Sequence, residues 1–314
     1  MAFRGIRFIP LDPQFDFVRR RYQAFALTGL LFVATVVALA TQGLNLGIDF
    51  AGGTVIEVAA AEPIDVGRVR EQVGALGVGQ TDIQNFGGPN DVLIRIQAQE
   101  TEAATQAAVQ KVRAALGPGY EYRRVENVGP KVGSELLRDG LIATALAILG
   151  IGIYVYFRFE WQFAVSALVS TFHDVFVTLG LFSILRLEFD LTAIAALLTL
   201  AGYSINDTVV VFDRIRETMR RRKSMPLAEI INLSVNRTLS RTIMTSLTTF
   251  LAIIPLLLFG GSSLFNFSFA MAWGIVIGTY SSIFVAAAML LYMPAIGQLG
   301  PREDRAAETA PMQR

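Results

Sequence analysis

Long apolar runs alternate with shorter polar segments along the chain, and six of the runs are long enough to cross a lipid bilayer. A membrane-spanning helix needs about 20 mostly apolar residues. The six runs lie at 22–42, 138–157, 161–185, 191–214, 241–261 and 267–293. The pattern predicts an α-helical polytopic membrane protein with six transmembrane helices. No charge occurs from Tyr22 to Ile48, a stretch longer than the apolar core of a signal peptide, so we expect the first run to be an uncleaved anchor.

The stretch 43–137 has the pattern of a small folded domain. Alternating or helical spacing predicts, in order, a strand at 54–60, a helix at 65–76, strands at 82–86 and 92–98, a helix at 102–116 and a strand at 120–128. This β-α-β-β-α-β order is that of a ferredoxin-like α+β unit. The stretch has no nucleophile motif, phosphate loop or metal-spaced cluster. We therefore expect it to bind a partner through a sheet face or edge, or to act as a spacer.

The positions of Lys and Arg predict the topology, because cytoplasmic loops carry an excess of these residues. Arginines concentrate in the tail at 1–21 and in a basic loop at 215–240. Both are predicted to be cytoplasmic, as is the C-terminal tail at 294–314, and 43–137 is then extracytoplasmic. Within the basic loop, the apolar spacing of 227–239 predicts a helix on the cytoplasmic bilayer surface, beside anionic lipid. The alternative is a loop that serves only as a topology signal.

One carboxylate stands out because it lies inside a predicted span. Asp207 is seven residues before Arg214, or about 10 Å into the helix. An ionised Asp in hydrocarbon costs about 2.5–3.5 kcal/mol on insertion scales, so such a residue usually faces a wet cavity, a partner or a proton path.

Other polar residues recur inside the spans at helical spacing. Three stripes follow from this spacing: Ser166, Ser170, Asp174 and Thr178; Ser204, Asp207, Thr208 and Val211; and Arg241, Thr245 and Thr248. Hydroxyls alone could mediate close helix packing, and Gly274, Gly278 and Ser282 have the spacing of such a packing face. The charged residues favour a second interpretation, in which the three stripes line one wet, protonatable seam. His173 either relays protons or packs as a hydrogen-bonded residue.

The overall charge and the missing cysteines narrow the alternatives. A formal net charge of +1 gives no indication of nucleic acid as a partner. The absence of cysteine excludes disulfides and thiolate metal sites. No metal is expected.

Several strings in the chain resemble the SecF family, membrane subunits of the bacterial Sec protein-export machinery. They are GIDFAGG at 47–53, VGPKVG at 128–133, HDV at 173–175, GYSINDTVVVFDRIRE at 202–217 and NRTLSRTIMTS at 236–246. The resemblance covers about residues 44 to 293, and the string at 202–217 is highly specific.

The resemblance implies an RND-type membrane architecture and a non-enzymatic role in the bacterial inner membrane, with both termini cytoplasmic. It implies SecD as a pseudo-symmetric partner, and SecYEG, SecA, translocating preproteins, YajC and YidC as further partners besides membrane lipid. Protons, rather than a cofactor, would be the coupling ion for late, ATP-independent steps of export. By motif match, Asp207 and Arg241 correspond to the family's proton-coupling pair.

We expect Asp207 to change protonation during function and Arg241 to govern when it does. Asn206 and Ser204 are candidates to hold water or orient the carboxylate, with Thr245, Asp174 and His173 as further supporting residues. The alternative is a static ion pair that only fixes helix packing.

Three other classes compete with a proton-coupled export subunit. A passive scaffold would hold translocon components together and tolerate Asp207→Asn. An intramembrane protease could use Asp174 with Asp207, or Ser204 with His173, but neither pair has the expected flanking glycines. A small-molecule exporter would need a drug-binding cleft, which one modest outer domain does not suggest.

Overall fold

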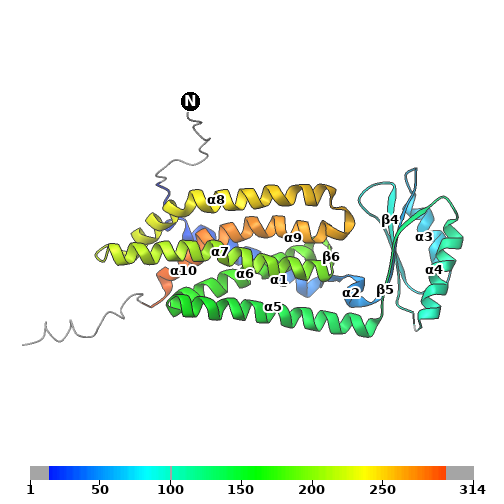
Figure 1. The fold of residues 1–314 in the computed structure, drawn as a ribbon, viewed down its shortest axis with the longest axis horizontal. Helices are drawn as coiled ribbons and strands as arrows, with labels where there is room; N and C mark the ends of the chain where they lie inside the picture. The colour runs from blue at the N-terminus through cyan, green and yellow to red at the C-terminus, as the bar shows by residue number, and fades with distance from the viewer. Residues whose placement is uncertain (1–13, 100, 295–314) are drawn as a thin grey trace, which may run out of the picture.

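A bundle of long helices joined to a small α+β domain makes up the computed structural model, which describes residues 14–99 and 101–294 (Figure 1). Helices α1 (Arg21–Thr41), α5 (Pro130–Arg158), α6 (Trp161–Leu185), α7 (Leu191–Arg221) and α8 (Leu227–Phe259) precede a last span, which comprises α9 (Gly261–Tyr280), η1 (Ser281–Ala286), α10 (Ala287–Met289) and η2 (Leu290–Tyr292). Six helices in the described part are long and apolar enough to cross a membrane. This confirms the predicted fold class. Most of the tails predicted at 1–21 and 294–314 lies outside the described residues.

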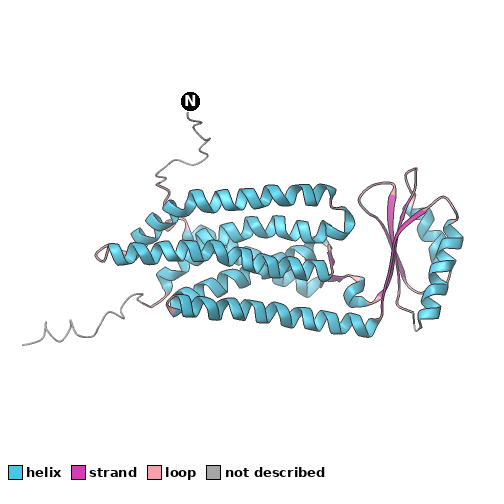
Figure 2. Cartoon of the chain, viewed as in Figure 1, coloured by secondary structure: helices cyan, strands magenta, loops and turns pink. Residues whose placement is uncertain are grey.

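The inserted domain has the predicted order of elements. Strands β2 (Gly53–Ala59), β3 (Thr81–Asn85), β4 (Asp91–Ile96) and β5 (Glu121–Val128) form an antiparallel sheet in the order β3-β4-β2-β5. Helices α3 (Val66–Gly74) and α4 (Glu102–Leu116) cover the face turned away from the bundle (Figures 1 and 2). The Asp65 side chain caps α3 by accepting from the Gly67 and Arg68 amides. Between the sheet and the helices lies a core of buried aliphatic residues, including Ile56, Val69 and Ile94.

A short segment with unusual backbone angles joins the bundle to the domain. Strand β1 (Asn45–Leu46) pairs in parallel with β6 (Glu188–Phe189), and the short helix α2 (Ile48–Ala51) follows. Gly52 and Gly53 then take φ values of 72° and 132°, which side chains with a Cβ rarely adopt. A Cβ on Gly53 would also meet the Ile96 carbonyl oxygen at 2.7 Å. The two glycines thus let the chain turn sharply into β2.

The basic loop predicted at 215–240 is mostly helical in the structure. Helix α7 continues to Arg221 and α8 begins at Leu227, so only residues 222–226 connect them. Glu217 pairs with Arg214 (2.5 Å) and Arg221 (2.7 Å) along the end of α7, and such pairs stabilise a helix.

The segment 227–239 is helical as predicted, but its predicted position on the bilayer surface is wrong. The segment is the first part of α8 and continues without a break to Phe259. Ile230 and Ile231 are only 4% and 1% exposed, because they pack into a core with residues of α6 and α7. The apolar face that the sequence pattern predicted to contact lipid is buried against other helices of the bundle instead.

Two further boundaries differ from the predicted ones. Span two begins at Pro130 rather than 138, directly after the last strand of the domain. Span six begins at Gly261 rather than 267, so the predicted outer loop at 262–266 is helical. In both places polar or small residues extend the helix beyond its apolar run, and an apolar pattern alone cannot show this.

Candidate functional site

Asp207 is buried at the interface of three helices. Its side chain projects from α7, and the residue is 3% exposed. Its two carboxylate oxygens accept long hydrogen bonds of 3.4 Å from the Thr245 and Ser246 hydroxyls of α8. Ser246 in turn shares a 2.6 Å hydrogen bond with Thr279 of α9. These four residues, which we name the Asp207 cluster, form a hydroxyl cage around one carboxylate.

Arg241 lies one helical turn before Thr245 but does not enter this cage. Its side chain is exposed, and the structure shows no ion pair between Arg241 and Asp207 in the part of the chain that it describes. The guanidinium is near enough for a Coulombic interaction with the carboxylate. Arg241 and Asp207 are therefore neighbours, as the predicted pair requires, but they do not form an ion pair in the structure.

A second buried carboxylate projects from α6 toward α7. Asp174 of α6 is fully buried and accepts hydrogen bonds from Ser204 Oγ at 2.5 Å and Ser281 Oγ at 2.7 Å. Its other oxygen lies 3.0 Å from His173 Nδ1. Ser282, beside Ser281, shares a 2.8 Å hydrogen bond with Thr208. We name this group the Asp174 cluster.

The two clusters divide the predicted seam into two. Ser204 was expected to support Asp207, but its hydroxyl donates to Asp174 instead. Thr245 contacts Asp207 as expected. The hydrogen bonds found in the described residues do not join the clusters, which share α7 as a wall. A proton passing between them would therefore need a movement of α7 or water.

Sequence reasoning missed four hydroxyls of these clusters as site residues. Ser246, Thr279 and Ser281 were not assigned to the site, and Ser282 was assigned only to helix packing. The signal was present: Ser281-Ser282 is a polar pair within a long apolar span. The packing interpretation itself has support, since a Cβ on Gly274 would meet Leu200 of α7 at 2.5 Å.

The face of α7 and α8 beside the Asp207 cluster exposes further polar groups. Asn206, Arg241 and Thr248 are all exposed, although they lie in segments that are otherwise apolar enough to span a membrane. The Thr248 hydroxyl donates to backbone carbonyls of α8. Hydrocarbon cannot satisfy the Asn206 and Arg241 side chains, and such groups in membrane proteins usually meet protein or a water-filled cavity. We name these three residues the polar face.

The chemistry that the two clusters offer is proton binding and hydrogen bonding. No group of three or more His, Cys, Asp or Glu residues that could hold a metal occurs in the described ranges. Both carboxylates are surrounded by hydroxyls, which donate to a charged carboxylate and also accept from a protonated one. Such surroundings suit a carboxyl group that changes its charge.

Comparison with protein families identifies the class of this fold and site. Residues 108–295 match the family described as protein export membrane protein SecD/SecF, C-terminal, and residues 37–64 match the SecD/SecF GG motif. The second match contains the glycine turn into β2.

Full-length relatives narrow the class further. The chain is 43% identical to the protein translocase subunit SecF of Cereibacter sphaeroides, with 98% of each chain covered. It is 50% identical to that of Magnetococcus marinus, with 94% of this chain and 96% of the relative covered. The chain belongs to the SecF family of protein translocase subunits, which are transport components rather than enzymes.

Solved structures share the fold. The crystal structure of SecDF from Thermus thermophilus, a translocon-associated membrane protein, matches with a TM-score of 0.81 and 37% identity over 91% of this chain. A SecDF structure in a super-membrane-facing form matches with a TM-score of 0.67 and 36% identity over 96% of this chain. The chain spans 39% and 40% of these two longer proteins.

Proposed function

We propose that this chain, together with a SecD partner, uses the proton gradient across the bacterial inner membrane to assist late, ATP-independent steps of preprotein export. The observation that carries the proposal is the pair of buried carboxylates, Asp174 and Asp207, each enclosed by hydroxyls inside membrane-spanning helices. Protons serve as the coupling ion, and no cofactor is needed. Both termini are proposed to be cytoplasmic, because α1 begins and the last span ends at the end of the bundle opposite the outer domain (Figure 1).

The polar face supports a second membrane subunit as the partner. Exposed Asn206 and Arg241 need a polar surface opposite them within the bilayer. The relatives' structures are named SecDF and are more than twice as long as this chain, so they have room for such a partner in the same molecule. We propose that SecD packs here, and that SecYEG, SecA, YajC and YidC associate with the pair.

In this mechanism Arg241 regulates the proton affinity of Asp207. In the structure its guanidinium lies near Asp207 without forming an ion pair. Movement of α8 against α7 would bring the cation onto the carboxylate or remove it. A nearby cation favours the charged carboxylate, so this movement would change the proton affinity of Asp207. Asp174 and His173 form a second station on α6, where Ser204 of α7 donates to Asp174.

The outer domain supplies the contact with the preprotein. Strands β3 and β5 are the two edges of its sheet, and Val125 on β5 is 40% exposed. An exposed strand edge can pair with an extended chain through backbone hydrogen bonds. We propose weak, sequence-tolerant binding of unfolded preprotein at these edges. Photo-crosslinkers on β5 that never capture a translocating chain would favour a spacer role instead.

The test of the central proposal uses complexes of the full chain with its partner. Asp207→Asn removes the titration but keeps a hydrogen-bonding group of similar size, and Arg241→Met removes the cation. We expect both complexes to assemble but to lose proton flux and gradient-driven preprotein release. Asp213→Asn is the matched control, because this residue is also on α7 but is exposed and paired with Arg158 at 3.3 Å.

The outcomes separate a proton carrier from a passive scaffold. Near-normal release with Asp207→Asn and Arg241→Met would mean that the pair is structural, and Asp174→Asn would then be tested for the coupling role. Normal release with all three variants would favour a scaffold.

A further inference from the structure

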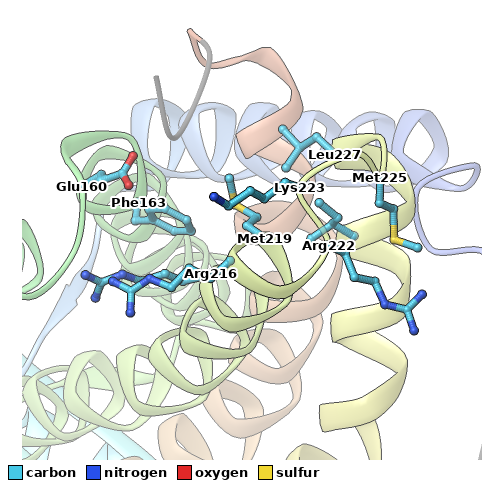
Figure 3. Close-up of a pocket in the computed structure, with 10 residues that line it drawn as sticks. Glu160, Phe163, Arg216, Met219, Arg222, Lys223, Met225 and Leu227 are labelled. Carbon is cyan, nitrogen blue, oxygen red and sulfur yellow. The ribbon is translucent and has the colours of Figure 1, made fainter. Parts of the chain in front are cut away.

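A cavity of about 520 Å³ opens at the end of the bundle opposite the outer domain. It lies between the start of α6, the end of α7 and the short connection to α8 (Figure 3). Neither carboxylate cluster contributes to its lining. The cavity is therefore separate from the proposed proton path.

Basic side chains dominate the polar part of this cavity. Arg216, Arg220, Arg222 and Lys223 line it, against one acidic residue, Glu160, among its lining residues in the described chain. Figure 3 shows Lys223 reaching toward Phe163, whereas Arg222 extends away from it.

The nearest acid on α7 does not neutralise these charges. Glu217 already pairs with Arg214 and Arg221, neither of which lines the cavity. In the described ranges, Arg220 and Lys223 form no ion pair. The cavity thus presents excess positive charge that an anionic ligand would match.

The deeper part of the cavity is apolar. Phe163 and Ile230 are 0% and 4% exposed, and Met219 and Leu227 complete this wall. A small inorganic anion gains nothing from such a wall, because it has no apolar surface to bury. An amphiphile with an anionic head and a hydrocarbon tail would use both parts of the lining.

The cavity also lies at the depth of lipid headgroups. Tyr154, Tyr156 and Phe157 at the end of α5 and Trp161 at the start of α6 are all exposed. Exposed aromatic side chains at the ends of spans mark the membrane–water interface. Trp161 is next to Glu160 in the chain and two residues from Phe163, both of which line the cavity, so the cavity lies at the level of the headgroup layer.

We propose that this cavity binds one anionic glycerophospholipid, with its phosphate held by Arg220 and Lys223. The glycerol and the first acyl carbons lie against Phe163, Met219 and Leu227. Basic pockets between helices at the cytoplasmic side of membrane proteins recognise such headgroups. This site goes beyond the proposed export function and relies on it only for assigning the lipid to the cytoplasmic leaflet.

The test titrates the purified full-length chain in detergent with phosphatidylglycerol or phosphatidylcholine and counts retained lipid by native mass spectrometry. We expect one phosphatidylglycerol to be retained much more strongly than phosphatidylcholine. Arg220→Gln and Lys223→Gln should each weaken its retention about fivefold, which corresponds to about 1 kcal/mol per charge. Arg237→Gln is the matched control, because this exposed arginine of α8 lies outside the cavity.

Three results would overturn the proposal. One is equal retention of the two lipids, and another is unchanged retention of phosphatidylglycerol in the Arg220→Gln/Lys223→Gln double variant. The third is displacement of the lipid by millimolar inorganic phosphate, which would show a site for a free anion. Thermal melting checks that each variant is folded, and Lys223→Arg should retain the lipid. None of these measurements depends on proton coupling, so they leave the proposed function untouched.

Discussion

The contact between the outer domain and the bundle depends on an ion pair that can be removed from either side. Arg95 of β4 points toward the bundle and pairs with Glu188 of β6. The two side chains are only 14% and 19% exposed. Removing one partner of a fully buried pair costs about 3–5 kcal/mol, because the other charge stays buried without compensation. For this slightly exposed pair we expect Arg95→Ala to weaken docking of the domain by about 2 kcal/mol, or about thirtyfold.

The assay measures the distance between the domain and the bundle directly. Because the chain has no cysteine, Cys introduced at Glu102 of α4 and at Leu258 of α8, both exposed, would carry the only two spin labels. We expect one narrow distance distribution in the parent chain and a broad one in Arg95→Ala. Arg123→Ala is the control: its pair with Asp91 lies within the domain, and its side chain is 49% exposed.

The pH dependence of docking follows from Glu188. Burial in the docked state raises the pKa of this carboxyl above its ordinary value of 4.5, and Asp190 and Asp49 act in the same direction while Arg95 opposes them. The docked state therefore binds a proton more tightly than the undocked state does. Docking is strongest below pH 4.5 and weakens as the pH rises through the raised pKa.

The Arg95→Ala variant makes this dependence larger, because it removes the cation that opposes the rise in the pKa of Glu188. Acidification should then narrow its broad distance distribution again. A distribution that stays narrow at neutral pH in Arg95→Ala, or one that broadens equally in Arg123→Ala, would refute the reasoning.

Three further predictions concern packing and hydrogen bonds. Ile94→Ala, at a fully buried position of the domain core, should cost about 2–5 kcal/mol and lower the melting temperature of the domain in calorimetry, while Leu251→Ala on the exposed side of α8 should not. Gly133→Ala should separate α5 from α2 at a cost of about 1–3 kcal/mol, since the new Cβ would meet the Phe50 carbonyl oxygen at 2.7 Å; unchanged melting would contradict this close approach. Asn236→Ala should speed proteolysis before α1, because the Asn236 side chain donates to the Phe15 carbonyl and accepts from its amide.

The apolar runs predicted the bundle well because length and hydrophobicity alone decide whether a helix can span a bilayer. The span at 161–185 even coincides with α6 at both ends. The strands of the outer domain could be predicted equally well, since alternating residues such as Val92, Ile94 and Ile96 all face one core.

The features that escaped prediction depend on contacts between segments far apart in the chain. Strands β1 and β6 contain two residues each and exist only because they pair with each other. The buried location of Ile230 and Ile231 depends on the position of α7, which amphipathic spacing cannot show. Likewise, nothing in its spacing indicated that Ser204 turns to Asp174 rather than Asp207, because both carboxylates are within reach of that part of α7.

The six π-helical residues of η1 determine which way the side chains after them face in the last span. Each residue advances a regular helix by about 100°, so the extra residue of a π turn rotates the rest of the helix by about that angle. This rotation brings Ala286, Ala287 and Leu290 onto the side that packs against α6 and α7. At the start of η1, two consecutive serines point inward, Ser281 to Asp174 and Ser282 to Thr208. A one-residue deletion within 281–286 would therefore do more than shorten the helix: it would turn the part of the span after residue 286 away from the core that it packs against.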